Sequence, residues 1–173
     1  MHRLIFAGLL VLCACAKPEP TPLTYRDAGQ GLYSNAVFER SRLAGHWTQV
    51  AAFAPANGPH CPPGEAQFTP QGAVMLLAAT LCLGGEEVRY SGPISFPQTG
   101  RMLLSGADPA GIGQPWWVLW VDTDYRTLVI GTPSGSFGFI LNRDDRLPGD
   151  RLAAARDILD WGGYDLGKLH LFN

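Results

Sequence analysis

The stretch that decides the fold runs from residue 116 to residue 143 and reads WWVLWVDTDYRTLVIGTPSGSFGFILNR. It holds three short runs of aromatic and β-branched residues, separated by turn residues at 123–125 and 132–136. Runs of this length, bounded by Gly, Pro, Ser and Asp, are typical of antiparallel strands joined by tight turns. The stretch therefore predicts three consecutive strands, at about 116–122, 126–131 and 137–143.

The same pattern extends upstream of residue 116. Turn residues such as Gly84-Gly85 and Gln98-Thr99-Gly100 recur at intervals of roughly eight to twelve residues. Between the turns lie five further strand candidates, at about 46–54, 65–69, 73–83, 86–96 and 101–105. Eight strands with short connections suit a closed antiparallel barrel, which exposes no strand edge.

Helical segments flank these strands. Residues 34–44 predict a short helical turn before the first strand. After Pro148 the period changes, and one helical face is apolar, formed by Leu152, Ala155, Ile158 and Leu159. Gly162-Gly163 ends that helix, and residues 168–172 predict a last strand. The expected fold is all-β: an eight-stranded antiparallel up-and-down β-barrel with a C-terminal α-helix and a short final strand.

Composition limits the class of protein. The chain has 173 residues, of which 46% are hydrophobic and 16% charged, and its net charge is −2. This balance excludes disorder, and the length suits one domain. No basic field is present to hold nucleic acid, so a nucleic-acid partner is not expected.

The first residues predict export and lipidation. Residues 4–14 form an apolar run of signal-peptide length after Arg3, too short to span a bilayer. The run ends in Leu12-Cys13-Ala14-Cys15, which resembles the bacterial lipobox. We expect a lipoprotein signal peptide at 1–14 and a diacylglycerol on Cys15; the alternative is a secreted protein cut by the general signal peptidase. Since Ala16 stands where Asp would retain the protein at the inner membrane, an outer-membrane anchor is implied.

Prolines alternate in Lys17-Pro18-Glu19-Pro20-Thr21-Pro22, which predicts a stiff solvated spacer. The expected organisation is a lipidated, Pro-rich tether at 15–33 followed by one barrel domain at 34–173 that includes the C-terminal helix. The lipid anchor would hold this domain at the outer membrane of a Gram-negative bacterium, facing the periplasm.

Three local patterns then resemble the signature regions of the lipocalin family. Gly45-His46-Trp47 opens the first strand, Thr123-Asp124-Tyr125 follows the sixth, and Arg143 closes the eighth. The order and placement of the three are more specific than any one alone. Residues 117–143 are most similar to the bacterial outer-membrane lipocalins, and the resemblance covers residues 40–173.

The resemblance implies structural roles for these signature residues. Trp47 would plug one end of the barrel, and Arg143 would lay its guanidinium over the indole and bond to loop carbonyls. Asp124 would hold the turn through side-chain to backbone hydrogen bonds. Gly45, Thr123 and Tyr125 are assigned to the same structural motif.

Period-two alternation predicts which side chains face the barrel cavity. The predicted ligand-binding residues are Gln49, Ala51, Trp116, Val118, Trp120, Val129, Gly131, Phe137, Phe139 and Leu141. This wall is aromatic and aliphatic with almost no charge, so the expected ligand is apolar over most of its length. A core filled by side chains would use the same residues and stays open as the alternative.

Cys61 and Cys82 remain once Cys13 is removed with the signal peptide and Cys15 is acylated, and they flank the turn at Gln71-Gly72 symmetrically. In an oxidising compartment this predicts a disulfide; two buried free thiols are the alternative. The His residues are scattered, no catalytic constellation is visible, and Ser134-Gly135-Ser136 lacks the nucleophile-elbow pattern. We therefore expect no enzyme activity, no cofactor and no metal.

The sequence thus predicts an outer-membrane-anchored lipocalin that binds a hydrophobic or amphipathic lipid. A fatty acid such as palmitate, or a lysophospholipid, would be bound for storage, transport or envelope maintenance. The alternative function is a filled-barrel interaction module of the cell envelope, which would use its open-end loops without transporting a ligand.

Overall fold

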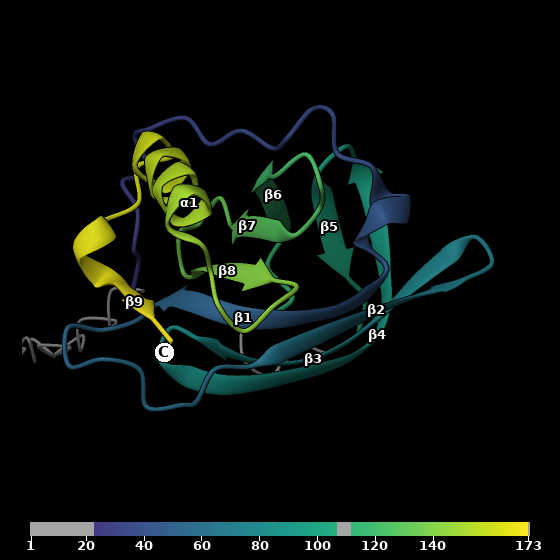
Figure 1. Ribbon diagram of the computed structural model, residues 1–173, viewed down its shortest axis with the longest axis horizontal. Helices are drawn as coiled ribbons and strands as arrows, with labels where there is room; N and C mark the ends of the chain where they lie inside the picture. The colour runs from purple at the N-terminus through teal and green to yellow at the C-terminus, as the bar shows by residue number, and fades with distance from the viewer. Residues whose placement is uncertain (1–22, 107–111, 173) are drawn as a thin grey trace, which may run out of the picture.

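The computed structural model describes residues 23–106 and 112–172 (Figure 1). The expected signal peptide 1–14, the lipidation site Cys15 and the spacer up to residue 22 lie outside the described residues.

Eight antiparallel strands form a closed barrel, and a ninth extends the sheet outside it. The strands are β1 (Gly45–Phe53), β2 (Glu65–Gln71), β3 (Val74–Leu83), β4 (Glu86–Gln98), β5 (Arg101–Leu104), β6 (Trp116–Val121), β7 (Thr127–Gly131), β8 (Gly138–Asn142) and β9 (Leu169–Leu171). Sequential strands pair from β2 through β8, β8 pairs with β1, and β1 pairs with β2, which closes the barrel. The predicted up-and-down barrel is confirmed, as is the short final strand, which pairs with β1.

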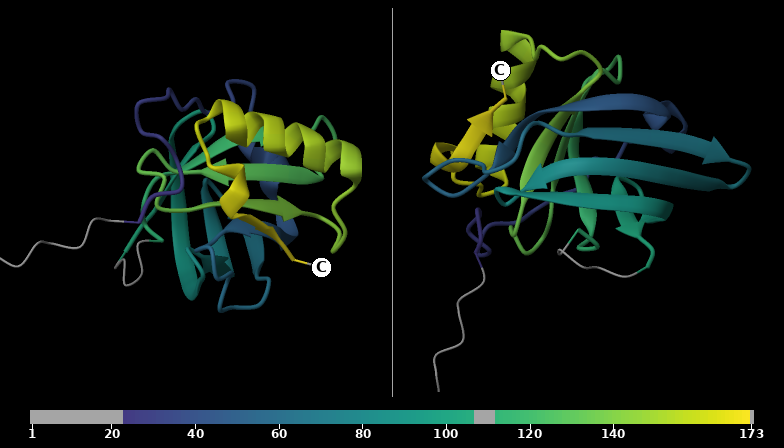
Figure 2. Two further views of the ribbon diagram at one scale, coloured as in Figure 1. Left: turned by 90° about the vertical axis from the view of Figure 1, so that its left-hand side faces the viewer. Right: turned by 90° about the horizontal axis from the view of Figure 1, so that it is seen from below.

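The helical segments pack around this barrel (Figures 1 and 2). The predicted turn at 34–44 is a shorter 3₁₀ helix, η1 (Arg40–Leu43), and a second, η2 (Leu166–Lys168), precedes β9. The helix α1 (Gly149–Trp161) runs across the outer face of the barrel and ends at Gly162. Its buried residues, Ala155 and Leu159, are two of the four residues of the predicted apolar face. Among the described residues, no helix is both long and apolar enough to span a membrane.

Two apolar clusters divide the core between the faces of the sheet. The larger draws residues from all eight barrel strands and none from α1, so it fills the barrel interior. The smaller combines Ala155 and Leu159 of α1 with Val129 and Ile140, so it lies between the helix and the outer face. Burying a row of apolar side chains on each face of the same strands stabilises both the barrel and the docked helix.

Candidate ligand-binding site

The barrel interior is the candidate site, and its lining follows from how each strand alternates. On β8 and just before it, Phe137, Phe139 and Leu141 point inward, while Ile140 packs under α1. Trp116 and Val118 on β6 point inward as well. The structure therefore brings these five predicted site residues together in the interior. Their contact with a ligand remains a prediction.

Four predicted lining residues face the other way. Ala51, Trp120 and Val129 pack in the cluster beneath α1. A side chain at Gly131 would meet the Tyr164 hydroxyl at 2.6 Å, which places this position on the same outer side. The prediction that these four line the cavity is wrong.

The errors at Ala51 and Trp120 have one cause, a β-bulge in each strand. The pairing of β1 with β8 shifts between Gln49 and Ala51, and that of β6 with β7 shifts between Val118 and Trp120. One extra residue reverses the alternation for every residue after it.

The error on β7 is a choice of the wrong face. Val118, which points inward, pairs with Ile130, and residues directly opposite in an antiparallel pair share a face. Leu128 and Ile130 are therefore the inward-facing residues of β7, as their place in the interior cluster shows.

An aromatic group forms the centre of the interior. The ring of Trp116 meets Phe139 edge-on at 5.1 Å between centroids and Phe137 at 6.4 Å. The indole nitrogen of Trp116 donates a hydrogen bond to the carbonyl of Ile112 at 2.8 Å. Such edge-to-face pairs stabilise by about 0.5–1.5 kcal/mol beyond their buried area.

The interior is closely packed. Trp116, Phe139, Val118 and Leu141 are 0% exposed, so no water-sized sphere reaches them. In the described part of the chain the one buried charged side chain is Arg26, which donates to the carbonyls of Gly162 and Pro133 outside the barrel strands. A ligand that enters must therefore displace side chains, and the wall that it meets is apolar.

Gln49 is buried but does not offer free polar atoms to a ligand. Its side-chain oxygen accepts hydrogen bonds from the Cys82 amide at 2.8 Å and the Gly64 amide at 3.1 Å. Its side-chain nitrogen donates to the Cys82 carbonyl at 2.8 Å. Because β2 begins only at Glu65, Gln49 bridges β1 to β3 where β2 is absent. Gln49 is part of the barrel wall.

The predicted disulfide between Cys61 and Cys82 closes the same part of the wall. The two Cα atoms lie 5.6 Å apart. Cys82 lies on β3, whereas Cys61 lies in the loop before β2 rather than on a neighbouring strand. The bond therefore ties the β1–β2 loop to the barrel.

Tyr25 links the β3–β4 and β7–β8 turns at one end of the barrel, which we call the mouth. Its amide donates to the carbonyl of Gly135 at 2.7 Å, and its hydroxyl donates to the carbonyl of Gly84 at 3.3 Å. The side chain of Tyr25 is buried, and this burial raises the pKa of its hydroxyl. A single tyrosine upstream of the barrel carried no sequence signal for this role.

Trp47 and Arg143 close the opposite end. The Arg143 guanidinium carbon lies 3.8 Å from the centroid of the Trp47 ring, as predicted. Arg143 Nη1 donates to the His46 carbonyl at 2.9 Å, and Nη2 donates to the Ala44 carbonyl at 2.9 Å. Partial burial lowers the pKa of Arg143. One stacked pair therefore joins the start of β1 to the residue after β8 at this end.

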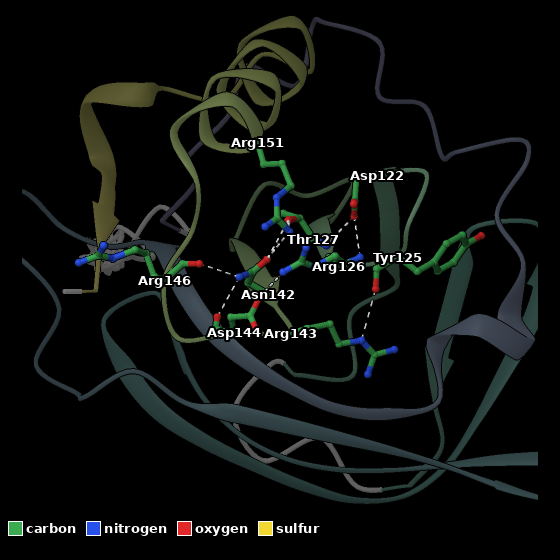
Figure 3. Close-up of polar contacts among 9 residues, drawn as sticks. All are labelled: Asp122, Tyr125, Arg126, Thr127, Asn142, Arg143, Asp144, Arg146 and Arg151. Carbon is green, nitrogen blue, oxygen red and sulfur yellow. Dashed lines mark hydrogen bonds and ion pairs between the residues drawn. The ribbon is translucent and has the colours of Figure 1, made fainter.

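The turn after β6 differs from its prediction in one residue (Figure 3). Oδ1 of Asp122, rather than the side chain of Asp124, accepts hydrogen bonds from the Arg126 amide at 2.7 Å and the Thr127 amide at 2.6 Å. Tyr125 has a positive φ of 57°, and its carbonyl accepts from Arg143 Nε at 3.3 Å. Asp122 is the residue placed to cap the amides that follow the turn.

Gly45 and Thr123 complete the structural motif. Gly45 has φ +104°, and a side chain there would meet Nη1 of Arg143 at 2.9 Å. The carbonyl of Thr123 accepts from Arg42 Nη2 at 3.0 Å. Both positions hold η1 and the β6–β7 turn against the start of β1.

A salt bridge on the outer surface joins this turn to the end of β8. Nη2 of Arg126 donates to Oδ2 of Asp144 at 2.7 Å, which raises the pKa of Arg126 (Figure 3). Beside it, Arg151 of α1 donates to Thr127 Oγ1 at 2.8 Å and Asn142 Oδ1 at 3.1 Å. These contacts fix the start of α1 to the barrel and take no part in the interior.

Comparisons with known proteins agree with this geometry. The family model described as a lipocalin-like domain matches residues 101–173. Temperature-induced lipocalin-1 of Arabidopsis thaliana is 36% identical over 55 residues, which cover 32% of this chain and 30% of that protein's length. The match therefore spans less than a third of that relative.

Two solved structures resemble the whole barrel. Insecticyanin of the tobacco hornworm Manduca sexta superposes with a TM-score of 0.61 at 16% identity, over 83% of this chain and 84% of its own. Lipocalin 12 from rat epididymis superposes with a TM-score of 0.61 at 12% identity, over 83% and 90%. At these identities the likeness concerns the fold. The chain has the lipocalin fold, and its C-terminal part, residues 101–173, is similar to a lipocalin-like domain.

Proposed function

We propose that this protein is a lipocalin of the bacterial outer-membrane lipoprotein type that binds a fatty acid, such as palmitate, or a lysophospholipid in its barrel. The observation that carries the proposal is the apolar cluster that fills a closed barrel, centred on Trp116, Phe137 and Phe139, with Gln49 as a polar side chain of the wall whose amide is bonded to the backbone. Such a lining favours an acyl chain and disfavours any ligand with charge along its length. Storage, transport or maintenance of envelope lipids follows from such binding.

Uptake requires the aromatic group to move. Phe137 and Trp116 belong to the interior yet lie at strand ends, Phe137 just before β8 and Trp116 at the start of β6. Strand ends and loops open at a smaller free-energy cost than strand centres. An entering acyl chain gains about 25 cal/mol per Å² of buried apolar surface, which offsets the displaced contacts. The polar head stays at the mouth, because the lining offers it no charge.

The membrane anchor is the second part of the proposal. Cys15 in the lipobox-like sequence carries a diacylglycerol and a further acyl chain, and Ala16 directs the protein to the outer membrane, where the barrel faces the periplasm. Acyl chains contribute about 0.8 kcal/mol per buried CH₂, so several chains make a stable tether. Replacing Cys15 with Ser is expected to abolish incorporation of labelled palmitate and release the protein from the membrane fraction; retention of both would refute lipidation at Cys15.

The alternative function has an observation in its favour as well. Interior residues with no exposure describe a barrel filled by its own side chains. Such a barrel would act as an interaction module of the envelope through the loops at its mouth. The two functions differ in whether the interior takes up lipid.

Lipid extraction and a tryptophan titration separate the two. The protein purified from membranes is extracted for mass spectrometry, then titrated with palmitate while tryptophan emission is followed. Trp116 lies inside the barrel and Trp120 lies beneath α1, so the two form a matched pair. We expect saturable quenching that Trp116→Phe removes and Trp120→Phe leaves intact. A folded protein with an empty extract and no saturable change would refute lipid binding and support the interaction module.

A further inference from the structure

An apolar cavity lies at the end of the barrel opposite the mouth. It encloses about 580 Å³ between η1, the tip of the β2–β3 hairpin and the later part of β4. This volume is within the range of pockets that hold small molecules. We call it the hairpin groove.

The hairpin groove lies where β3 and β4 stop pairing. Their pairing ends with Met75 opposite Ile94, but β4 continues to Gln98 while the β2–β3 hairpin turns at Gly72. The hairpin projects past the rest of the barrel beside η1 (Figure 1), and the view from below shows the same projection (Figure 2). Side chains from both faces of the sheet therefore reach one cavity.

The floor of the groove is apolar. Met75, Ile94 and Phe96 lie along it, and Phe96 stacks on Phe38 of the segment before η1 at 6.2 Å between centroids. Val74 at the rim is 46% exposed. An apolar floor with an exposed apolar rim favours a ligand that is a hydrocarbon over most of its length.

The rim carries one cation and no acid. Arg40 of η1 lines the groove, and among the residues that line it none is Asp or Glu. The nearby Arg42 is engaged, since its guanidinium lies 4.1 Å from the centre of the Tyr125 ring and 3.9 Å from Glu39. Within residues 23–106 and 112–172, the guanidinium of Arg40 has no ion-pair or hydrogen-bond partner. Its charge is complementary to an anion at the mouth of the groove.

We propose that the hairpin groove binds a single-chain amphiphile with an anionic head. The acyl chain lies against Met75, Ile94 and Phe96, and the carboxylate or phosphate of the head meets Arg40. Met75 and Ile94 also belong to the interior cluster, so the floor of the groove borders the barrel interior, whereas Arg40 and the exposed Val74 at its rim lie outside that cluster. Binding in the groove does not require an acyl chain between Trp116 and Phe139, so this proposal does not rest on the proposed function. It gives the protein a lipid site on the side of η1, away from the loops of the mouth.

Methyl NMR on the full chain locates the ligand. The ¹³C-methyl signals of Ala73 and Val74, which line the groove outside the interior cluster, report the groove, and those of Val118 and Leu141 report the interior. The probes are dodecanoate, dodecyl phosphate and the neutral dodecanol, each below its micelle concentration. We expect saturable shifts of the groove signals with one or both anions, and weaker binding of dodecanol. The comparison of dodecanoate with dodecyl phosphate identifies the head that is preferred.

Three variants test the chemistry. Arg40→Gln is expected to weaken anion binding by about threefold to fivefold, which is typical of one exposed ion pair. Arg89→Gln, on the exposed surface of β4, is the matched control and leaves binding unchanged. Ser95→Trp places a large ring in the groove from an exposed strand position and is expected to abolish the shifts in a folded protein.

Two results would overturn the proposal. Shifts confined to Val118 and Leu141 would assign the ligand to the interior and leave the groove empty, without touching the proposed function. Equal affinity of Arg40→Gln and Arg89→Gln for both anions would show that Arg40 does not recognise the head. Shifts confined to the groove would support the hairpin groove and count against lipid binding in the barrel.

Discussion

Tyr164 gives the molecule a pH-dependent stability that can be calculated. It lies after α1, is 2% exposed, and its hydroxyl accepts from the Thr132 amide at 2.9 Å and donates to the Phe137 carbonyl at 3.0 Å. Burial raises the pKa of Tyr164 to about 12, from an ordinary value of 10.0. The neutral phenol is therefore favoured in the folded state.

The sign of the effect follows from proton linkage. Below pH 10 the phenol is neutral in both states and its full contribution is present. Above pH 10 the unfolded chain loses the proton first, so stability falls as pH rises toward about 12. At about 1.4 kcal/mol per pKa unit, the loss between pH 8 and pH 11 is about 1.3 kcal/mol from this group.

The variant Tyr164→Phe isolates this contribution. It leaves the Thr132 amide without its acceptor, so we expect it to be less stable than the wild type by about 1–3 kcal/mol at pH 8. Because phenylalanine does not ionise, that difference should shrink by about 1.3 kcal/mol at pH 11. Urea unfolding followed by tryptophan emission at both pH values measures it, with the exposed Tyr33→Phe as the control. A difference that stays constant from pH 8 to pH 11 would show that Tyr164 ionises normally and that the segment after α1 is not docked as described.

Two further predictions concern the ends of the barrel. Arg143→Lys keeps the charge but loses the planar guanidinium that stacks on Trp47, so we expect the free energy of unfolding to fall by about 2–3 kcal/mol. Urea unfolding measures the change, with Arg146→Lys as the control. A loss below about 0.5 kcal/mol would contradict the stacked arrangement. Replacing both Cys61 and Cys82 with Ala, or reducing the disulfide of the wild type, should each lower the free energy of unfolding by about 3 kcal/mol, because the bond closes a loop of 21 residues. An unchanged urea midpoint in both cases would show that the bond does not constrain the loop.

The pattern in residues 116–143 predicted the barrel because strand length, turn chemistry and alternation are local properties of the sequence. It predicted β6, β7 and β8 within one or two residues of their observed bounds. The stacking of Arg143 on Trp47 was also predicted, since the resemblance to a known family carried it. Which face each residue takes was a harder question, because one bulge changes the alternation and its position depends on the neighbouring strand.

Ala51 and Trp120 illustrate that limit. Each follows an extra residue, Val50 in β1 and Leu119 in β6, and no local signal in the sequence marks either bulge. Gln49 is a second example, since its role in the wall depends on where β2 begins on the other side of the gap. Asp124 was the predicted cap of the turn after β6, and only the path of the chain through Tyr125 placed Asp122 in that role instead.

From the amino-acid sequence alone came the all-β class, the strand count, the terminal helix, the apolar character of the interior and the pairing of Cys61 with Cys82. These follow from composition and from patterns that span a few residues, or from a single pair of cysteines. The three-dimensional packing supplied the facing of residues beyond each bulge, the closed packing of the interior, the bridge that Tyr25 makes across the mouth and the hairpin groove beside Arg40. Each of these depends on contacts between segments that are distant in the sequence. Such contacts are decided by the register in which whole strands pair, and no single residue determines that register.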